Sequence, residues 1–232
     1  MNAYQHLLNQ LQIAYAHPGG KDTTEIWMDK LDLSKMEQIL EVGCGAGHTI
    51  RQLRSKTPAT IYGIDVSPPE MIAVAKKQTD DLRDIKINQA DIRSLPYKPE
   101  SFDLIIAESV LTFTPVNESL QEITRLLKPN GYLVLLEMTR IEILLSKDQQ
   151  QIKDFYLLPN LYSLTEWKNI LLAHQYNYVE FQQVGKQSNS IQMEHPIDEV
   201  MLATLYEHYY LNELYQDQLL AYLFIAKKVG DE

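Results

Sequence analysis

The sequence predicts an α/β fold in which helices cover a doubly wound, mostly parallel sheet. Between residues 38 and 139, short apolar segments alternate with segments of helical periodicity. Such alternation is typical of parallel strands joined by right-handed crossovers. Three glycines follow the first apolar segment at alternate positions, which indicates a tight turn between a strand and a helix. With 232 residues, 45% of them hydrophobic, the chain is long enough for one globular domain without disulfides or metals.

Composition and charge limit the possible partners. The net charge of −10 repels phosphate backbones, so we expect no nucleic-acid partner. No apolar run reaches the roughly 18 residues of a membrane span, and the first residues show no basic-then-apolar signal, so we expect no membrane partner. The only cysteine, Cys44, lies in the glycine turn, which leaves no disulfide framework and no cysteine-based metal cluster. We therefore expect a cytoplasmic protein without a metal.

Two helices are predicted before the sheet. The first spans residues 2–16 and ends at the His17-Pro18-Gly19-Gly20 segment, because proline and glycine interrupt helices. Thr23 or Thr24 is expected to cap the second, which carries Trp27, Met28 and Leu31. We favour the interpretation that both helices cover a sheet edge; the alternative is a lid over a ligand.

The core elements follow in order. Apolar, β-branched segments predict strands at 39–42, 59–65, 85–90, 102–107 and 132–138. Helical spacing predicts helices at 49–56, where Pro58 follows, at 69–78, and at 120–127, where a Lys-Pro-Asn-Gly turn follows.

The last third is less regular. Residues 140–158 have a helical pattern, and Ser163 with Glu166 forms a capping box that opens a helix running to about His174. Residues 178–184 alternate as a strand does, 196–215 are helical and rich in tyrosine, and 219–229 form a last strand that we expect to be antiparallel. We predict a single domain (1–232) composed of N-terminal helices (1–37), a cofactor-binding core (38–139), a helical cap with the sixth strand (140–218) and the last strand (219–232).

The glycine turn predicts the ligand class. Dinucleotide sites follow Gly-x-Gly-x-x-Gly, whereas here the third glycine is Gly47 and His48 stands where that pattern requires glycine. Glu41 precedes the turn; a carboxylate there suits a cationic ligand group better than a pyrophosphate. Asp65 closes the second strand about 20 residues later, the place for a hydrogen bond to ribose hydroxyls.

These residues resemble the class I S-adenosylmethionine-dependent methyltransferases, which have a Rossmann-like fold, over residues 38–139. The first motif is Glu41-Val42-Gly43-Cys44-Gly45-Ala46-Gly47. The later motifs are 63–67 with Met71, 90–92 with Leu95-Pro96, 101–106 and 127–132. The resemblance implies S-adenosylmethionine as cofactor and these binding residues: Glu41, Gly43, Cys44, Gly45, Gly47, Asp65, Val66, Met71, Asp91, Ile92, Glu108 and Ser109.

The same resemblance implies a role for each group. The backbone of 43–47 faces the methionyl part, with Glu41 near its ammonium, and Asp65 accepts from both ribose hydroxyls. Asp91 and Ile92 contact the adenine, on which Val66 and Met71 pack. Glu108 and Ser109 lie near the sulfonium and the incoming acceptor.

The expected activity is in-line methyl transfer to a small-molecule acceptor, a reaction that needs alignment more than a fixed base. No catalytic residue is identified; the candidate bases are His17, His48, His174, His195, His208, Glu108 and Tyr15. The aromatic residues of the cap suit either core packing or an acceptor pocket, and exposed tyrosines would suit a homodimer contact: Tyr156, Tyr162, Trp167, Tyr206, Tyr209, Tyr210 and Tyr215. Two alternatives stay open: a cofactor-binding protein without transfer activity, and a nicotinamide dehydrogenase.

Overall fold

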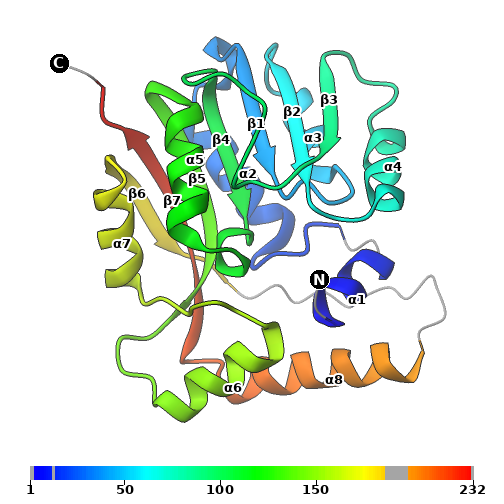
Figure 1. The fold of residues 1–232 in the computed structure, drawn as a ribbon, viewed down its shortest axis with the longest axis vertical. Coiled ribbons are helices and arrows are strands. Elements are labelled where there is room, and N and C mark those ends of the chain that lie inside the picture. Colours follow the sequence, from blue (N-terminus) through cyan, green and yellow to red (C-terminus); the bar gives the residue numbers. More distant parts are fainter. Residues whose placement is uncertain (1–2, 12–13, 186–197, 231–232) are drawn as a thin grey trace.

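The protein is built around a seven-stranded sheet with the order β3-β2-β1-β4-β5-β7-β6 (Figure 1). The computed structural model describes residues 3–11, 14–185 and 198–230. The strands are β1 (Gln38–Val42), β2 (Thr60–Asp65), β3 (Ile85–Gln89), β4 (Phe102–Glu108), β5 (Leu127–Arg140), β6 (Tyr176–Gln183) and β7 (Leu219–Lys228). Pairs among β1 to β5 are parallel, whereas β7 runs antiparallel to both β5 and β6. The predicted fold class is confirmed, including the antiparallel last strand.

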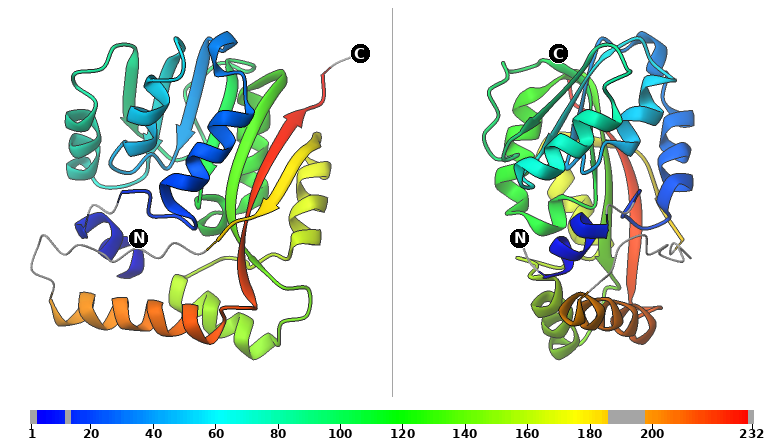
Figure 2. Two further views of the ribbon diagram at one scale, coloured as in Figure 1. Left: turned by 180° about the vertical axis from the view of Figure 1, so that it is seen from behind. Right: turned by 90° about the vertical axis from the view of Figure 1, so that its right-hand side faces the viewer.

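Helices cover both faces of the sheet (Figure 2). On one face lie α2 (Gly20–Lys30), α3 (His48–Arg54) and α4 (Pro69–Gln78). On the other lie α5 (Val116–Leu126) and α7 (Leu164–Ala173). The short 3-10 helix η1 (Leu33–Lys35) lies between α2 and β1, and η2 (Leu111–Phe113) lies between β4 and α5. The strands of the core are nearly continuous hydrophobic runs because helices bury them on both faces.

The N-terminal segment corrects two expectations. Helix α1 (Ala3–Leu11) ends earlier than predicted, and Tyr15 has a left-handed backbone with φ of 53°. Helix α2 begins at Gly20, so Thr23 and Thr24 lie buried inside it and do not cap it. Trp27 packs α2 on the face of the sheet, not on its edge. The large indole buries more apolar area against central strands than it would at an edge.

Two further helices form a cap beyond the carboxyl ends of the central strands (Figures 1 and 2). They are α6 (Ser146–Tyr156), shorter than the predicted 140–158, and α8 (Glu199–Leu214), which Asp198 caps through the amide of Met201 at 2.8 Å. Residues 196 and 197 of the predicted helix lie outside the described residues. Helix α1 packs against α8, so α1 belongs to the cap. Helix α1 therefore does not cover a sheet edge, and its residues line the cavity described below.

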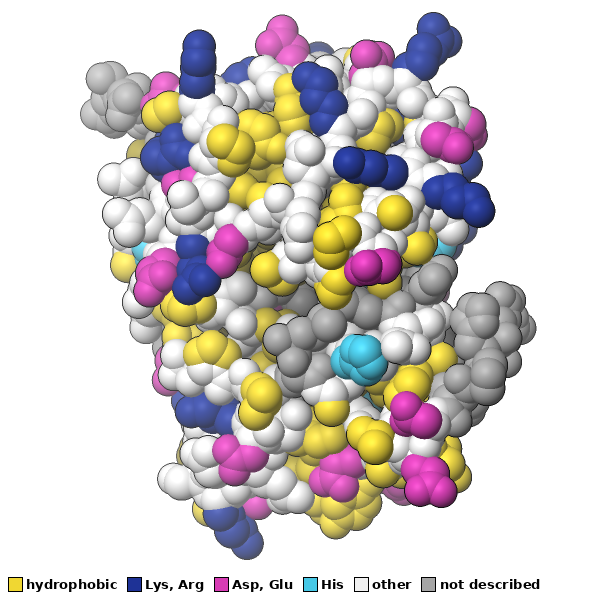
Figure 3. Space-filling view, turned by 45° about the vertical axis from the view of Figure 1, so that its right-hand side comes forward, with side chains coloured by type: hydrophobic (Ala, Val, Ile, Leu, Met, Phe, Trp, Pro, Cys, Tyr) yellow, Lys and Arg dark blue, Asp and Glu magenta, His cyan; other side chains and the backbone are white. Residues whose placement is uncertain are grey.

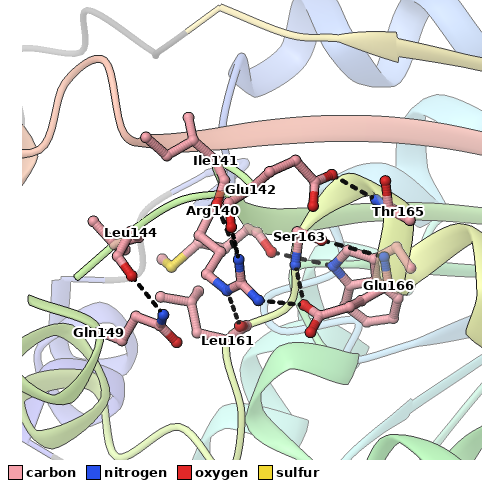
Figure 4. A network of polar contacts seen from close by, with 11 residues as sticks. Arg140, Ile141, Glu142, Leu144, Gln149, Leu161, Ser163, Thr165 and Glu166 are labelled. Carbon is pink, nitrogen blue, oxygen red and sulfur yellow. Dashed lines mark hydrogen bonds and ion pairs between the residues drawn. The ribbon is translucent and has the colours of Figure 1, made fainter. Parts of the chain in front are cut away.

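Arg140, at the end of β5, ties the α6 insertion to the sheet (Figure 4). Its guanidinium donates to the carbonyl of Leu161 at 3.1 Å, to those of Ile141 and Glu142 at 3.0 Å, and to Glu166 at 2.8 Å. The start and the end of the insertion are thus held by one side chain. Glu166 also completes the predicted capping box with Ser163, which is confirmed.

The surface carries both signs of charge. On the face in Figure 3, basic side chains are interspersed with acidic and hydrophobic ones and form no continuous basic surface among the described residues. In the described part of the chain, no helix has the length and apolarity needed to cross a bilayer.

Candidate functional site

A large cavity lies where the central strands end. It has a volume of about 960 Å³ and is lined by the glycine turn, the ends of β1, β2 and β4, and residues of α1, α6 and α8. Strand β1 lies between β2 and β4, so the chain order reverses there. Open α/β sheets bind ligands at such a switch point, because the loops on its two sides diverge. The volume is at the upper end of ligand pockets, which is enough for two small molecules.

The glycine turn needs its glycines for different reasons. Gly43, Gly45 and Gly47 all have positive φ, of 71°, 48° and 84°. A Cβ on Gly43 would lie 2.4 Å from the Val110 side chain, whereas a Cβ on Gly45 would meet nothing within 4 Å and would project into open space beside the cavity. Gly47 does not line the cavity; it starts α3 and approaches the carbonyl of Ala75 in α4. The backbone of 43–46, and not of 47, therefore forms the wall.

Asp65 holds the turn in place. One of its carboxylate oxygens accepts the amide of Gly45 at 2.8 Å, and the other accepts the amide of Ser67 at 2.8 Å. The amides of Gly43 and Cys44 both donate to the carbonyl of Ile64, at 2.7 and 3.0 Å. The end of β2 thus positions the glycine turn before any ligand binds. Each carboxylate oxygen keeps a second lone pair for a ligand hydroxyl.

Glu41 is the most unusual group in the wall. Its side chain is buried, and its Oε2 is the one buried side-chain polar atom without a hydrogen-bond partner among the described residues. Burial, and then the nearby carboxylates of Glu108 and Asp65, raise the pKa of Glu41 well above its usual range. A buried acceptor without a partner costs stability, so it indicates a site built for something absent from the chain itself.

Glu108, at the end of β4, accepts hydrogen bonds from the N-terminal segment and from α3. Its carboxylate accepts from Thr24 at 2.8 Å, from the indole of Trp27 at 3.0 Å and from Thr49 at 3.1 Å, and the His17 ring lies at 3.5 Å. These partners come from α2, α3 and the segment before α2. Sequence reasoning did not find this cluster, since Thr24 and Trp27 had no signal beyond helix formation and lie more than 80 residues from Glu108.

The adenine-binding residues predicted from the sequence also meet at the cavity. Val66 is exposed at its rim, whereas Met71 and Ile92 are buried against it. Asp91 lines the rim too, but its carboxylate already pairs with the Arg93 guanidinium at 2.6 Å, which lowers the pKa of Asp91. Any ligand amino group there would share this carboxylate with Arg93.

The cap supplies the opposite wall. It consists of aromatic and aliphatic side chains with one imidazole and two amides: Tyr4, Gln5, Leu7, Leu8, Tyr156, Leu205, His208, Tyr209 and Asn212. Phe113 of η2 and Met138 of β5 add to its apolar surface. Of the aromatic cap residues singled out in the sequence, Tyr156 and Tyr209 line the cavity. Trp167 and Tyr215 are buried in the core, and Tyr206 and Tyr210 are exposed. Tyr162 packs on the core.

The predicted site residues therefore largely converge. Eleven of the twelve cofactor residues line the cavity, Gly47 being the exception. Of the candidate bases, His17, His48, His208, Glu108 and Tyr15 line it, His174 does not, and His195 lies outside the described residues.

Comparisons with known proteins agree with this geometry. Residues 40–135 match the family model described as a methyltransferase domain. The chain is 31% identical over 236 residues to the uncharacterized methyltransferase YodH of Bacillus subtilis (strain 168), covering 98% of this chain and 100% of that protein.

Two solved structures show the same fold. The [4+2]-cyclase SpnF has a TM-score of 0.78 at 19% identity, covering 99% of this chain and 94% of its own. The geranyl diphosphate C-methyltransferase of Streptomyces coelicolor A3(2), solved with Mg²⁺, geranyl diphosphate and S-adenosyl-L-homocysteine, has a TM-score of 0.71 at 15% identity, covering 90% of this chain and 78% of its own. The full-length relative and the matched domain, on this sheet and glycine turn, show that the chain belongs to the class I S-adenosylmethionine-dependent methyltransferases.

Proposed function

We propose that the glycine-turn half of the cavity binds S-adenosylmethionine and that the cap half holds a small-molecule methyl acceptor. The observation that carries the proposal is the unpartnered Oε2 of Glu41 in the cavity wall. An ammonium group can donate a hydrogen bond to this oxygen, and its positive charge would compensate the negative charge of the buried carboxylate. The amino group of the methionyl part has this chemistry, and a pyrophosphate has the opposite one.

The other lining residues fit the same cofactor. The Asp65 carboxylate, already fixed by two amides, has lone pairs left for two ribose hydroxyls. Met71 and Ile92 offer apolar surface to a flat base, and Asp91 offers an acceptor at its edge. The space beside Gly45 leaves room for the methionyl chain next to the backbone.

The chain's own part in the reaction is binding, alignment and exclusion of water. The cofactor, when bound, supplies a methyl group already activated on a sulfonium, so no residue has to activate the donor. Alignment of the acceptor in the cavity lowers the barrier by removing translational freedom and competing water. Glu108 contributes by holding the N-terminal segment beside the glycine turn through its hydrogen bonds to Thr24, Trp27 and Thr49.

Binding of an ammonium ligand should release a proton. The pKa of Glu41 is raised in the ligand-free protein, and an adjacent cation would lower it. The affinity for an ammonium-bearing ligand is therefore expected to increase as the pH rises, and the Glu41→Gln variant is expected to lose that increase.

The experiment has two steps. Calorimetric titration of the purified protein with S-adenosylhomocysteine and, separately, with NAD tests the cofactor; binding of NAD alone would overturn the proposal. Incubation with methyl-labelled S-adenosylmethionine and a panel of oxygen, nitrogen and sulfur acceptors then tests transfer. Cofactor binding without labelled product from any acceptor would favour the alternative of a binding protein without transfer activity.

A further inference from the structure

Among the described residues that line the cavity, no lysine or arginine is free of a carboxylate partner. Among the described residues, four carboxylate residues line the whole cavity, Glu41, Asp65, Asp91 and Glu108, whereas Arg93 is the one lysine or arginine there. The Arg93 guanidinium is already bound, at 2.6 Å to Asp91 and at 3.9 Å to Glu118. A phosphate or carboxylate on the acceptor would therefore meet like charge and no counter-ion, which is costly in a buried site.

The apolar surface of the cap half is formed largely by aromatic rings that pack on one another. The Tyr4 ring stacks on the His208 imidazole with centroids 4.7 Å apart at 22°, and it meets the Tyr156 ring edge-on at 5.0 Å. These three side chains come from α1, α8 and α6, so the cap closes around them. Such a surface favours a flat apolar molecule over a flexible polar one.

A chain of hydrogen bonds sets the protonation of His208. The Asn212 side-chain amide donates to the Tyr156 hydroxyl oxygen at 3.2 Å and to the His208 carbonyl at 2.8 Å. The Tyr156 hydroxyl lies 2.9 Å from Nδ1 of His208. With Asn212 donating to its oxygen, the hydroxyl is best satisfied when it donates to Nδ1. Burial lowers the pKa of His208 to about 4, so at neutral pH the imidazole carries one proton, on Nε2.

That Nε2–H group has no acceptor among the described residues. The Asn212 amide nitrogen lies 3.5 Å from Nε2, but it is itself a donor. His208 lines the cavity. A ligand oxygen with a lone pair is the group that would complete the arrangement.

We propose that the methyl acceptor is an uncharged, flat, largely apolar molecule that presents a hydrogen-bond-accepting oxygen to Nε2 of His208. The proposal rests on the proposed function, because it names the acceptor class for that cavity. It makes His208 a specificity-determining residue, and it makes Tyr156 the positioning residue that fixes the imidazole proton.

Four naphthalene probes separate the shape, the hydrogen bond and the charge. 2-Acetylnaphthalene is uncharged with an accepting oxygen, 2-ethylnaphthalene lacks the oxygen, 2-naphthoate is anionic, and 2-naphthylmethylammonium is cationic. Fluorescence titration of the protein saturated with S-adenosylhomocysteine gives each dissociation constant. We expect 2-acetylnaphthalene to bind about 3- to 10-fold more tightly than 2-ethylnaphthalene, and both charged probes to bind more weakly than 2-acetylnaphthalene.

Variants assign the hydrogen bond. His208→Phe keeps a ring to stack on Tyr4 and should abolish the difference between the acetyl and ethyl probes, while His208→Gln, which keeps a side-chain donor, should restore part of it. His174→Phe, the same substitution at a position outside the cavity, is the matched control and should keep the difference.

The results that would overturn the acceptor proposal differ from those that would overturn the proposed function. Tighter binding of 2-naphthoate or of the ammonium probe, equal binding of the acetyl and ethyl probes, or a difference that survives His208→Phe would overturn the acceptor proposal. So would a lack of binding of all four probes to protein that binds S-adenosylhomocysteine. Failure of S-adenosylhomocysteine to bind would instead overturn the proposed function, and the probes would then be titrated alone.

Discussion

Replacing Glu41 with methionine is expected to stabilise the ligand-free protein and weaken its binding of S-adenosylhomocysteine. Methionine is unbranched and close to glutamate in length, so it can fill the same buried space. The substitution removes a buried oxygen that has no partner. Such an atom costs about 1–3 kcal/mol, so the free energy of unfolding should rise by about that amount. At this chain length the melting temperature would rise by roughly 2–4 °C for each kcal/mol.

The loss of ligand binding follows from the same atom. A hydrogen bond to a charged group contributes about 1.5–3 kcal/mol, which corresponds to a dissociation constant roughly 10- to 150-fold weaker. Calorimetric titration with S-adenosylhomocysteine near neutral pH measures it. Opposite effects on stability and on affinity from one substitution are typical of residues kept for function.

Glu137 is the matched control. It is as buried as Glu41, but its carboxylate accepts the amides of Leu111 at 2.8 Å and Thr112 at 3.0 Å, and that of Val110 at 3.3 Å. Glu137→Met would leave these donors without a partner and should destabilise the protein by at least about 2 kcal/mol. Unfolding of both variants should be followed at about pH 5, below the pKa of about 7 to which burial raises Glu137.

Destabilisation of the protein by Glu41→Met, as by Glu137→Met, would contradict the role of Glu41 as a ligand-binding group. An unchanged dissociation constant for S-adenosylhomocysteine would contradict that role as well.

Three further changes test other parts of the structure. Asp65→Ala should weaken binding of S-adenosylhomocysteine by about 1–3 kcal/mol, measured calorimetrically; an unchanged constant would contradict the assignment of the ribose hydroxyls. Burial raises the pKa of Glu137 from 4.5 to about 7, a difference equivalent to about 3 kcal/mol. The folded state therefore holds a proton that the unfolded chain releases, and stability should fall as the pH rises from about 4.5 through about 7. In denaturant titrations Glu137→Gln should lose this part of the decrease, and an identical pH profile would refute it. Arg140→Met should cost about 2 kcal/mol and loosen the α6 insertion, seen as faster amide hydrogen exchange at 146–156 with little change in β1; uniform exchange would argue against a local clamp.

The sequence alone determined the fold and half of the site, because those features are encoded locally. Alternating apolar and helical segments predict parallel strands wherever crossovers are short, and the glycines with Glu41 come directly after the first strand. Asp65 closes the next strand, which pairs with β1 in register. The carboxyl ends of neighbouring parallel strands meet at one edge, so strand-end residues come together without further information.

Only the tertiary structure decided how the rest of the chain completes that site. Thr24 meets Glu108 across 84 positions, and Tyr156 meets His208 across 52. Those contacts depend on where helices pack, and helical periodicity predicts which face is apolar but not which partner it meets. The same reason explains why α1 joined the cap and why Glu137 caps the turn after β4. The acceptor half of the cavity is composed of such long-range contacts, whereas the cofactor half consists mostly of strand ends.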